Sequence, residues 1–181
     1  MQLSNIYLNN FKNHLESNFD LIDGINCFVG KNGIGKTNIL DAIHYLCLTK
    51  SYYNSSDALN INFDNDYFTL KGNFINDEDN YELICSLSKN TNKIVKINGK
   101  RYKRFSDHIG KFPIVIISPT DSNLIIEGPD VRRRYLNSSI SQFDNNYLIN
   151  LIEYNRALKQ RNKLLKNISE GANIDNITID A

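Results

Sequence analysis

Gly30-Lys31-Asn32-Gly33-Ile34-Gly35-Lys36-Thr37 matches the pattern G-x-x-x-x-G-K-[ST], with a third glycine inside it. Glycines let the backbone wrap tightly, so that successive N–H groups can point at a phosphate. The first turn of a following helix adds the positive end of its dipole. In such a loop we expect Lys36 to reach the β- and γ-phosphates and the hydroxyl of Thr37 to bind Mg²⁺. Residues 30–37 therefore predict a P-loop that binds ATP and Mg²⁺, rather than a glycine-rich turn without a ligand.

The flanking residues predict the strand and the helix that a P-loop joins. Residues 25–29 form a short β-rich run, which indicates a buried strand ending at the first glycine. From Ile39 to Cys47 the apolar residues recur on one face of a helix. A second continuous apolar run, residues 112–117, suits a strand that is covered on both faces. This arrangement is typical of an α/β fold of the P-loop NTPase class.

Alternating polar and apolar residues predict an antiparallel β insertion at about residues 66–105. Asn98-Gly99 is a strong signal for a two-residue hairpin turn within it. Two further strands are expected near the start of the chain, at residues 3–8 and 17–21. The alternating segments of the insertion are residues 67–75, 81–88 and 93–97.

Helices are expected after residue 128. Pro129 suits the first position of a helix, and residues 145–168 repeat apolar positions every 3.5 residues. Such a repeat indicates either the start of a coiled-coil arm or a long helix lying on the domain. We therefore expect a P-loop ATPase subdomain at residues 1–128 and the start of a helical arm subdomain at 129–181.

Composition excludes several classes of protein. Hydrophobic residues make up 41% and charged residues 23%, as in ordinary globular proteins. The longest strictly apolar runs, which contain no proline, have four residues, too short for a membrane span, and the first residues hold no signal-peptide core. The three cysteines are widely spaced, which favours reduced thiols in a cytoplasmic protein over metal ligands.

Charge is unevenly distributed, although the net charge is only +1. Residues 57–82 hold seven acidic residues against one lysine, whereas residues 89–111 hold eight basic residues against one aspartate. Residues 131–166 hold eight basic residues against two acidic ones. The two basic stretches indicate either a polyanion partner or a solvated charged face. The candidate DNA-binding residues in them are Lys100, Arg101, Lys103, Arg104, Arg132, Arg133 and Arg134.

A P-loop ATPase also needs an acidic residue after a buried strand to hold Mg²⁺. The apolar run at residues 112–117 leads into Ser118, and the first carboxylate after it belongs to Asp121. We do not assign Asp121 that role, and no catalytic residue is assigned within residues 1–181.

Five stretches, in this order along the chain, narrow the class further. They are Leu8-Asn9-Asn10-Phe11-Lys12-Asn13, residues 28–43, Ser118-Pro119-Thr120-Asp121, Gly128-Pro129 with Arg132-Arg133-Arg134-Tyr135-Leu136, and Leu158-Lys159-Gln160-Arg161-Asn162. Together they resemble the N-terminal half of the RecF family of SMC/Rad50-like ABC ATPases. The resemblance covers nearly the whole chain and is more specific than the P-loop alone.

The resemblance implies an ABC ATPase head that dimerises on ATP, and it places Lys12 and Asn13 near the nucleotide. It implies DNA as a partner, in gapped or single-strand/double-strand junction form. The implied role lies in recombinational repair, replication-fork maintenance and the SOS response, assisting recombinase loading together with recombination mediator proteins. A weak ATPase in the full-length protein and a cytoplasmic, nucleoid-associated location also follow from it.

The chain departs from the family in two places and leaves other classes open. The usual Pro-Glu-Asp is Pro119-Thr120-Asp121 here, and a usual aspartate is Asn137. The signature motif and the Walker B carboxylate are expected beyond Ala181, which suggests a fragment of a longer chain. The alternatives are another SMC-like head in chromosome maintenance, a transporter nucleotide-binding subunit, or a small P-loop kinase.

Overall fold

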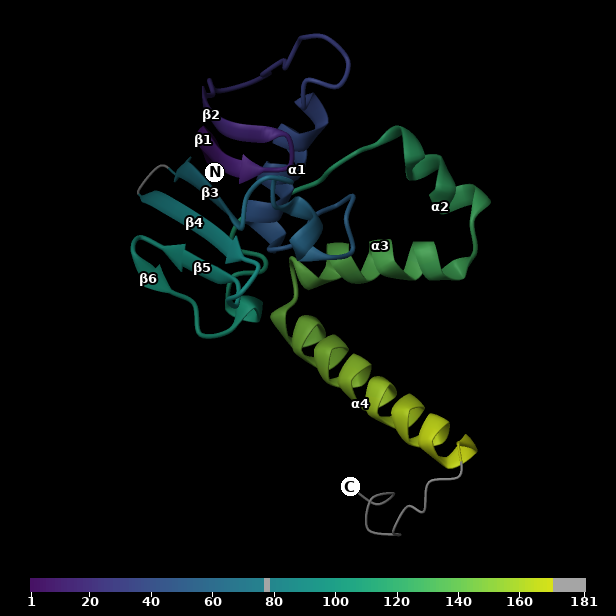
Figure 1. The fold of residues 1–181 in the computed structure, drawn as a ribbon. Helices are drawn as coiled ribbons and strands as arrows, with labels where there is room; N and C mark the ends of the chain where they lie inside the picture. Colours follow the sequence, from purple (N-terminus) through teal and green to yellow (C-terminus); the bar gives the residue numbers. More distant parts are fainter. Residues whose placement is uncertain (77–78, 171–181) are drawn as a thin grey trace. The chain divides into compact units, whose positions relative to one another are not determined.

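The computed structural model describes residues 1–76 and 79–170 (Figure 1). The chain divides into two compact units, the first covering Met1–Ile126 and the second beginning at Glu127. Each unit is described by itself. None of the described helices is long and apolar enough to cross a membrane.

One six-stranded antiparallel sheet forms the centre of the first unit, in the order β2-β1-β3-β4-β5-β6. The expected insertion is therefore not a separate sheet: its first strand pairs directly with β1, so that Leu8 lies opposite Leu70. The hairpin turn at Asn98 and Gly99 is confirmed, with φ values of 46° and 76° at the two residues. The strands are β1 (Gln2–Phe11), β2 (His14–Asp20), β3 (Tyr67–Ile75), β4 (Asn80–Ser88), β5 (Ile94–Ile97) and β6 (Lys100–Arg101).

The hydrophobic core lies between one face of this sheet and helix α1 (Lys36–Leu48). Alternate residues of β3 are buried, as the two-residue period of a strand requires. From α1, Tyr45 packs edge-on against Phe11 and Phe68, with ring centroids 6.1 and 5.3 Å away. The predicted apolar face of the helix and the predicted alternation of the strands are confirmed.

The two runs that we expected to be buried strands are not strands in the structure. Residues 25–29 and 113–117 form no ladder with any strand of the described chain. Ile25, Val29 and Ile117 are between 84% and 89% exposed. An apolar run becomes a buried strand only where neighbouring strands pair with it, and none of the described strands pairs with these segments.

Short helical segments connect the larger elements of the first unit. Phe112, which begins the second apolar run, is buried, because its ring packs against that of Phe74 with the centroids 4.6 Å apart. Ile114 of the same run is half-buried against the core. The short segments are the 3-10 helices η1 (Asp57–Asn60), η2 (Phe105–Asp107) and η3 (Pro119–Ser122), and the helix α2 (Asn123–Ile126).

The second unit contains two contacting helices, α3 (Pro129–Ser141) and α4 (Asn145–Ser169). Pro129 begins α3, as predicted. Asp144 caps α4 by accepting a hydrogen bond from the backbone N–H of Tyr147. The Tyr147 hydroxyl donates to Asn137 Oδ1 at 2.5 Å, which ties the two helices together. No residue of α4 is buried.

The alternation in β3 gives a direct test of the fold. Because Leu70 is fully buried under α1, Leu70→Ala should lower the free energy of unfolding by about 2–5 kcal/mol. Asn73→Ala, on the exposed face of the same strand, should change it by no more than about 0.5 kcal/mol. Urea denaturation followed by circular dichroism measures both. Equal losses in the two variants would contradict the assigned faces of the sheet.

Candidate nucleotide-binding site

The P-loop leads into the first turn of α1 with the backbone that its glycines permit. Gly33 and Gly35 have φ values of +83° and +105°, in the left-handed region that favours glycine. Gly35 is the residue immediately before the helix, and its carbonyl accepts from the backbone N–H of Asn38 at 2.9 Å. The predicted loop and helix are confirmed, although no strand precedes them.

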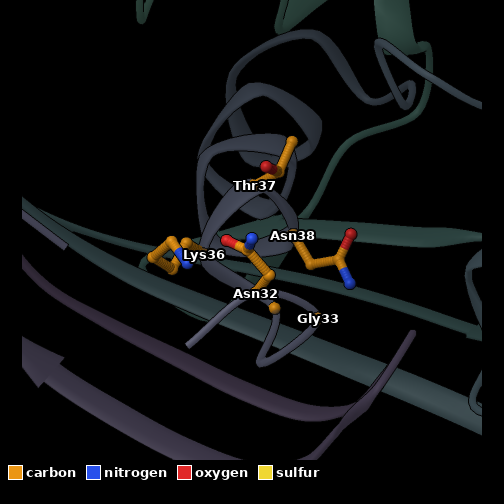
Figure 2. A pocket seen from close by; sticks show the side chains of 6 residues that line it. Asn32, Gly33, Lys36, Thr37 and Asn38 are labelled. Atoms are coloured by element: carbon orange, nitrogen blue, oxygen red, sulfur yellow. The ribbon is translucent and has the colours of Figure 1, made fainter. Parts of the chain in front are cut away.

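A hollow of about 280 Å³ lies at this helix end (Figure 2). None of the residues that line it is acidic, whereas one is a lysine and the others offer hydroxyl, amide or backbone N–H groups. Such a lining suits an anion, because helix N-termini bind phosphate through free N–H groups. The lining residues are Asn32, Gly33, Gly35, Lys36, Thr37 and Asn38.

Lys36 closes the loop on itself. Its ammonium donates to the carbonyl oxygens of Gly30 at 2.8 Å and Lys31 at 2.9 Å. An ammonium group has three N–H donors, so these contacts use two and leave one for an anion in the hollow. Thr37 is the second residue of α1, and its side chain also lines the hollow (Figure 2).

The turn between β1 and β2 lies against the P-loop. Asn13 donates from Nδ2 to the Gly33 carbonyl at 3.1 Å and accepts from Asn38 Nδ2 at 2.7 Å. The next residue, His14, lies 3.1 Å from the Gly35 carbonyl through its Nε2. The family resemblance singles out Asn13 but not His14. Sequence reasoning therefore missed His14, and the only signal that could have found it is its place directly after Asn13.

Lys12 points away from the hollow, toward the body of α1. Its ammonium lies 2.6 Å from Asp41 Oδ2, and the side chain of Asp41 is fully buried. Asp41 also accepts from the Ser51 hydroxyl and from the backbone N–H of Tyr52, both at 2.7 Å. This buried carboxylate is therefore paired and hydrogen-bonded, as burial of a charge requires. Lys12 does not line the hollow.

Asp121 is held by a second group of contacts. The Tyr52 hydroxyl donates to its Oδ1 at 2.5 Å, and the backbone N–H of Ser118 donates to its Oδ2 at 2.8 Å. The hydrogen bond from Tyr52 holds the pKa of Asp121 below its usual range, and the same bond raises the pKa of Tyr52 to about 12. Asp121 thus stays ionised and occupied by protein donors at neutral pH.

The acidic and basic stretches neutralise each other in part. Lys93 pairs with Asp57 at 2.7 Å, and Lys89 pairs with Asp66 at 3.1 Å. The four candidate DNA-binding residues of the hairpin region remain exposed, and Lys100 and Arg101 form β6 itself. In the second unit, Arg132 donates to the Glu127 carbonyl and Arg133 pairs with Asp130. All three arginines at 132–134 are exposed.

Among residues 1–76 and 79–170, no three histidine, cysteine, aspartate or glutamate side chains lie close enough together to hold a metal ion. The three thiols are free. Burial raises the pKa of Cys47 and of Cys85 to about 12, which keeps both neutral.

Known proteins resemble this chain in sequence over nearly its whole length. The AAA domain family matches residues 5–178. The DNA replication and repair protein RecF of Flavobacterium johnsoniae is 46% identical over 179 residues, which are 99% of this chain and 50% of that protein. RecF of Parabacteroides distasonis is 45% identical over 96% of this chain and 48% of its own length. This chain thus spans about half the length of these curated relatives.

Solved structures agree with the sequence relatives. The recombination mediator protein RecF with ATP, in the RecFOR pathway, is 34% identical and superimposes with a TM-score of 0.88 over 97% of this chain and 48% of that one. A structure from work on SMC ATPases, 22% identical, has a TM-score of 0.61 over 77% of this chain and 99% of its own, and shows the fold alone. These matches confirm the predicted P-loop NTPase fold class and the predicted resemblance. The chain belongs to the AAA domain family, and its sequence and fold match the N-terminal half of RecF.

Proposed function

We propose that this chain is the P-loop half of an ATP-dependent DNA repair and replication protein of the RecF type. The observation that carries the proposal is the hollow at the start of α1. Lys36 and Thr37 line it together with Gly33 and Gly35, whose φ values lie in the left-handed region. Relatives named as DNA replication and repair proteins, and a RecF structure with ATP, support it.

In this proposal the phosphates of ATP occupy the hollow. Backbone N–H groups at the start of α1 and the remaining N–H of Lys36 bind phosphate oxygens, since both carry positive charge into the site. Thr37 offers its hydroxyl to Mg²⁺, which neutralises phosphate charge when bound. Asn13 does not line the hollow but donates a hydrogen bond to the carbonyl of Gly33, which does. The Lys12 ammonium is committed to Asp41 and takes no part in phosphate binding.

DNA binding by the whole protein is the second element of the proposal. For the full-length protein we propose binding to gapped or junction DNA and recombinase loading together with mediator proteins. We also propose a weak ATPase activity, ATP-dependent dimerisation and a nucleoid-associated location. Phosphate contacts supply most of the affinity in such binding. The exposed cations of the hairpin region and of residues 132–134 are the candidate contacts within this chain.

The nucleotide site can be tested with one substitution. Lys36→Ala removes the ammonium that faces the hollow, and it should weaken Mg·ATP binding by about 30-fold or more, the equivalent of a charged hydrogen bond. Isothermal titration calorimetry on the 181-residue chain measures this. Lys50→Ala, which removes an exposed lysine just beyond the far end of α1, serves as the control and should bind like wild type. Equal ATP affinity in Lys36→Ala and wild type would refute the P-loop assignment.

The hairpin can be tested by its salt dependence. Replacing Lys100, Arg101, Lys103 and Arg104 by alanine should weaken binding to DNA of unrelated sequences. It should also flatten the plot of log affinity against log salt by about 0.9 for each phosphate that the variant no longer neutralises. Fluorescence anisotropy at several salt concentrations measures both quantities. Lys50→Ala with Lys71→Ala removes two exposed cations elsewhere and should leave the slope nearly unchanged. If the quadruple variant keeps its affinity and slope, solvated lysines explain the hairpin and it lies outside the DNA site.

A further inference from the structure

We propose that Asn13 and His14 are positioning residues of the P-loop, which hold the Gly33 and Gly35 carbonyls away from the phosphate site. The inference rests on the proposed binding of ATP in the hollow. It concerns side chains that touch the loop from behind and do not themselves line the hollow.

An anion site built from backbone requires its carbonyl oxygens to point away, because each carries partial negative charge. In a trans peptide the C=O and the following N–H point in opposite directions. A donor that fixes a carbonyl on one side therefore also directs the next N–H to the other side. For Gly35 the next N–H belongs to Lys36, the first residue of α1 and a member of the lining.

Four carbonyls of this loop have donors. The Lys36 ammonium holds those of Gly30 and Lys31. The turn between β1 and β2 holds the Gly33 carbonyl through Asn13 at 3.1 Å and contacts the Gly35 carbonyl through His14 at 3.1 Å. The Gly35 carbonyl also accepts from the backbone N–H groups of Asn38 at 2.9 Å and Ile39 at 3.2 Å. The turn and the first residues of α1 thus hold the Gly33 and Gly35 carbonyls, whereas those of Gly30 and Lys31 accept from the Lys36 ammonium.

The tautomer of His14 follows from its two partners. A carbonyl oxygen only accepts, so Nε2 must carry the proton that it donates to Gly35. Nδ1 then accepts from the Ser17 hydroxyl, 2.9 Å away. The Phe19 ring lies nearly perpendicular to the imidazole, with the two centroids 6.4 Å apart, and supports it in this orientation.

Gly35 shows how closely the turn approaches the loop. A Cβ atom at this position would lie 2.5 Å from Asn13 Oδ1 and 2.5 Å from His14 Nε2. Both distances are shorter than any ordinary contact, and the φ value of +105° already favours glycine. The space that a side chain would need at residue 35 is filled by the two positioning residues.

The turn is itself fastened on three sides, so it can act as a rigid support. The Lys12 ammonium pairs with buried Asp41 on α1. The Lys12 backbone N–H donates to the Asn60 carbonyl at 2.8 Å, and its carbonyl accepts from Asn62 Nδ2 at 2.6 Å. Phe11, next in the chain, is fully buried in the core. A donor on such a support holds a carbonyl at little further entropic cost.

The test compares His14→Leu with His14→Gln in the 181-residue chain. Leucine removes the donor but keeps apolar bulk against Phe19, whereas the glutamine amide can place an N–H near the position of Nε2. By calorimetry, His14→Leu should bind Mg·ATP and Mg·triphosphate roughly 3- to 10-fold more weakly, as the loss of one hydrogen bond predicts, and His14→Gln should recover most of that loss. Asn13→Ala should also weaken the binding of both ligands.

His44→Leu is the matched control. His44 is also a buried histidine that contacts a backbone carbonyl, that of Lys50 at 2.9 Å, but it lies toward the other end of α1. Its substitution should leave the affinity for both ligands unchanged.

A second readout needs no nucleotide. Hydrogen–deuterium exchange of the amides at residues 31–36 should speed up in His14→Leu and Asn13→Ala, while exchange in β3 and β4 stays as in wild type. This measurement separates the inference from the proposed function, because it stands even if wild type fails to bind ATP. Unchanged exchange in both variants would overturn the inference, as would a glutamine variant that binds as weakly as the leucine variant.

Discussion

The buried ion pair between Lys12 and Asp41 joins the two parts of the molecule that build the proposed nucleotide site. Lys12 begins the turn that leads from β1 into β2, and Asp41 lies on α1, five residues after Lys36. A buried carboxylate is costly unless its oxygens are paired, and here three donors reach it. The turn therefore has one well-defined position on the helix, and the loop between them is shaped by that position.

The Lys12–Asp41 pair also explains why the proposed phosphate site lies near the turn between β1 and β2. The sheet presents its apolar face to α1, which fixes the helix axis, while the turn beyond Phe11 fixes the helix start. Asn13 and His14 then lie under the glycines with their polar atoms already in use. A phosphate site formed in this way is preorganised, because its donors need no rearrangement of the backbone to face a ligand.

Local pairing also determines which charges remain available. Lys89 and Lys93 belong to the most basic stretch of the chain, yet both pair with aspartates of the acidic stretch. Lys93 is largely buried by this contact and lies over the Tyr45 ring. The net charge of a stretch therefore overstates its unpaired positive charge, although the four cations at residues 100, 101, 103 and 104 remain exposed.

The sequence by itself determined the features that depend on neighbouring residues: the glycine loop before α1, the strand alternation, the Asn98-Gly99 turn and the start of α3 at Pro129. Each is set by backbone dihedral preferences or by the period of one element, so a short window carries the signal. Only the tertiary structure decided which strands pair, and it left residues 25–29 and 113–117 outside the sheet. It also decided that Lys12 meets Asp41 and that His14 meets Gly35. These contacts join residues about 20 to 30 positions apart, and no local pattern records them, because they exist only once the sheet has placed its edge turn against the first helix.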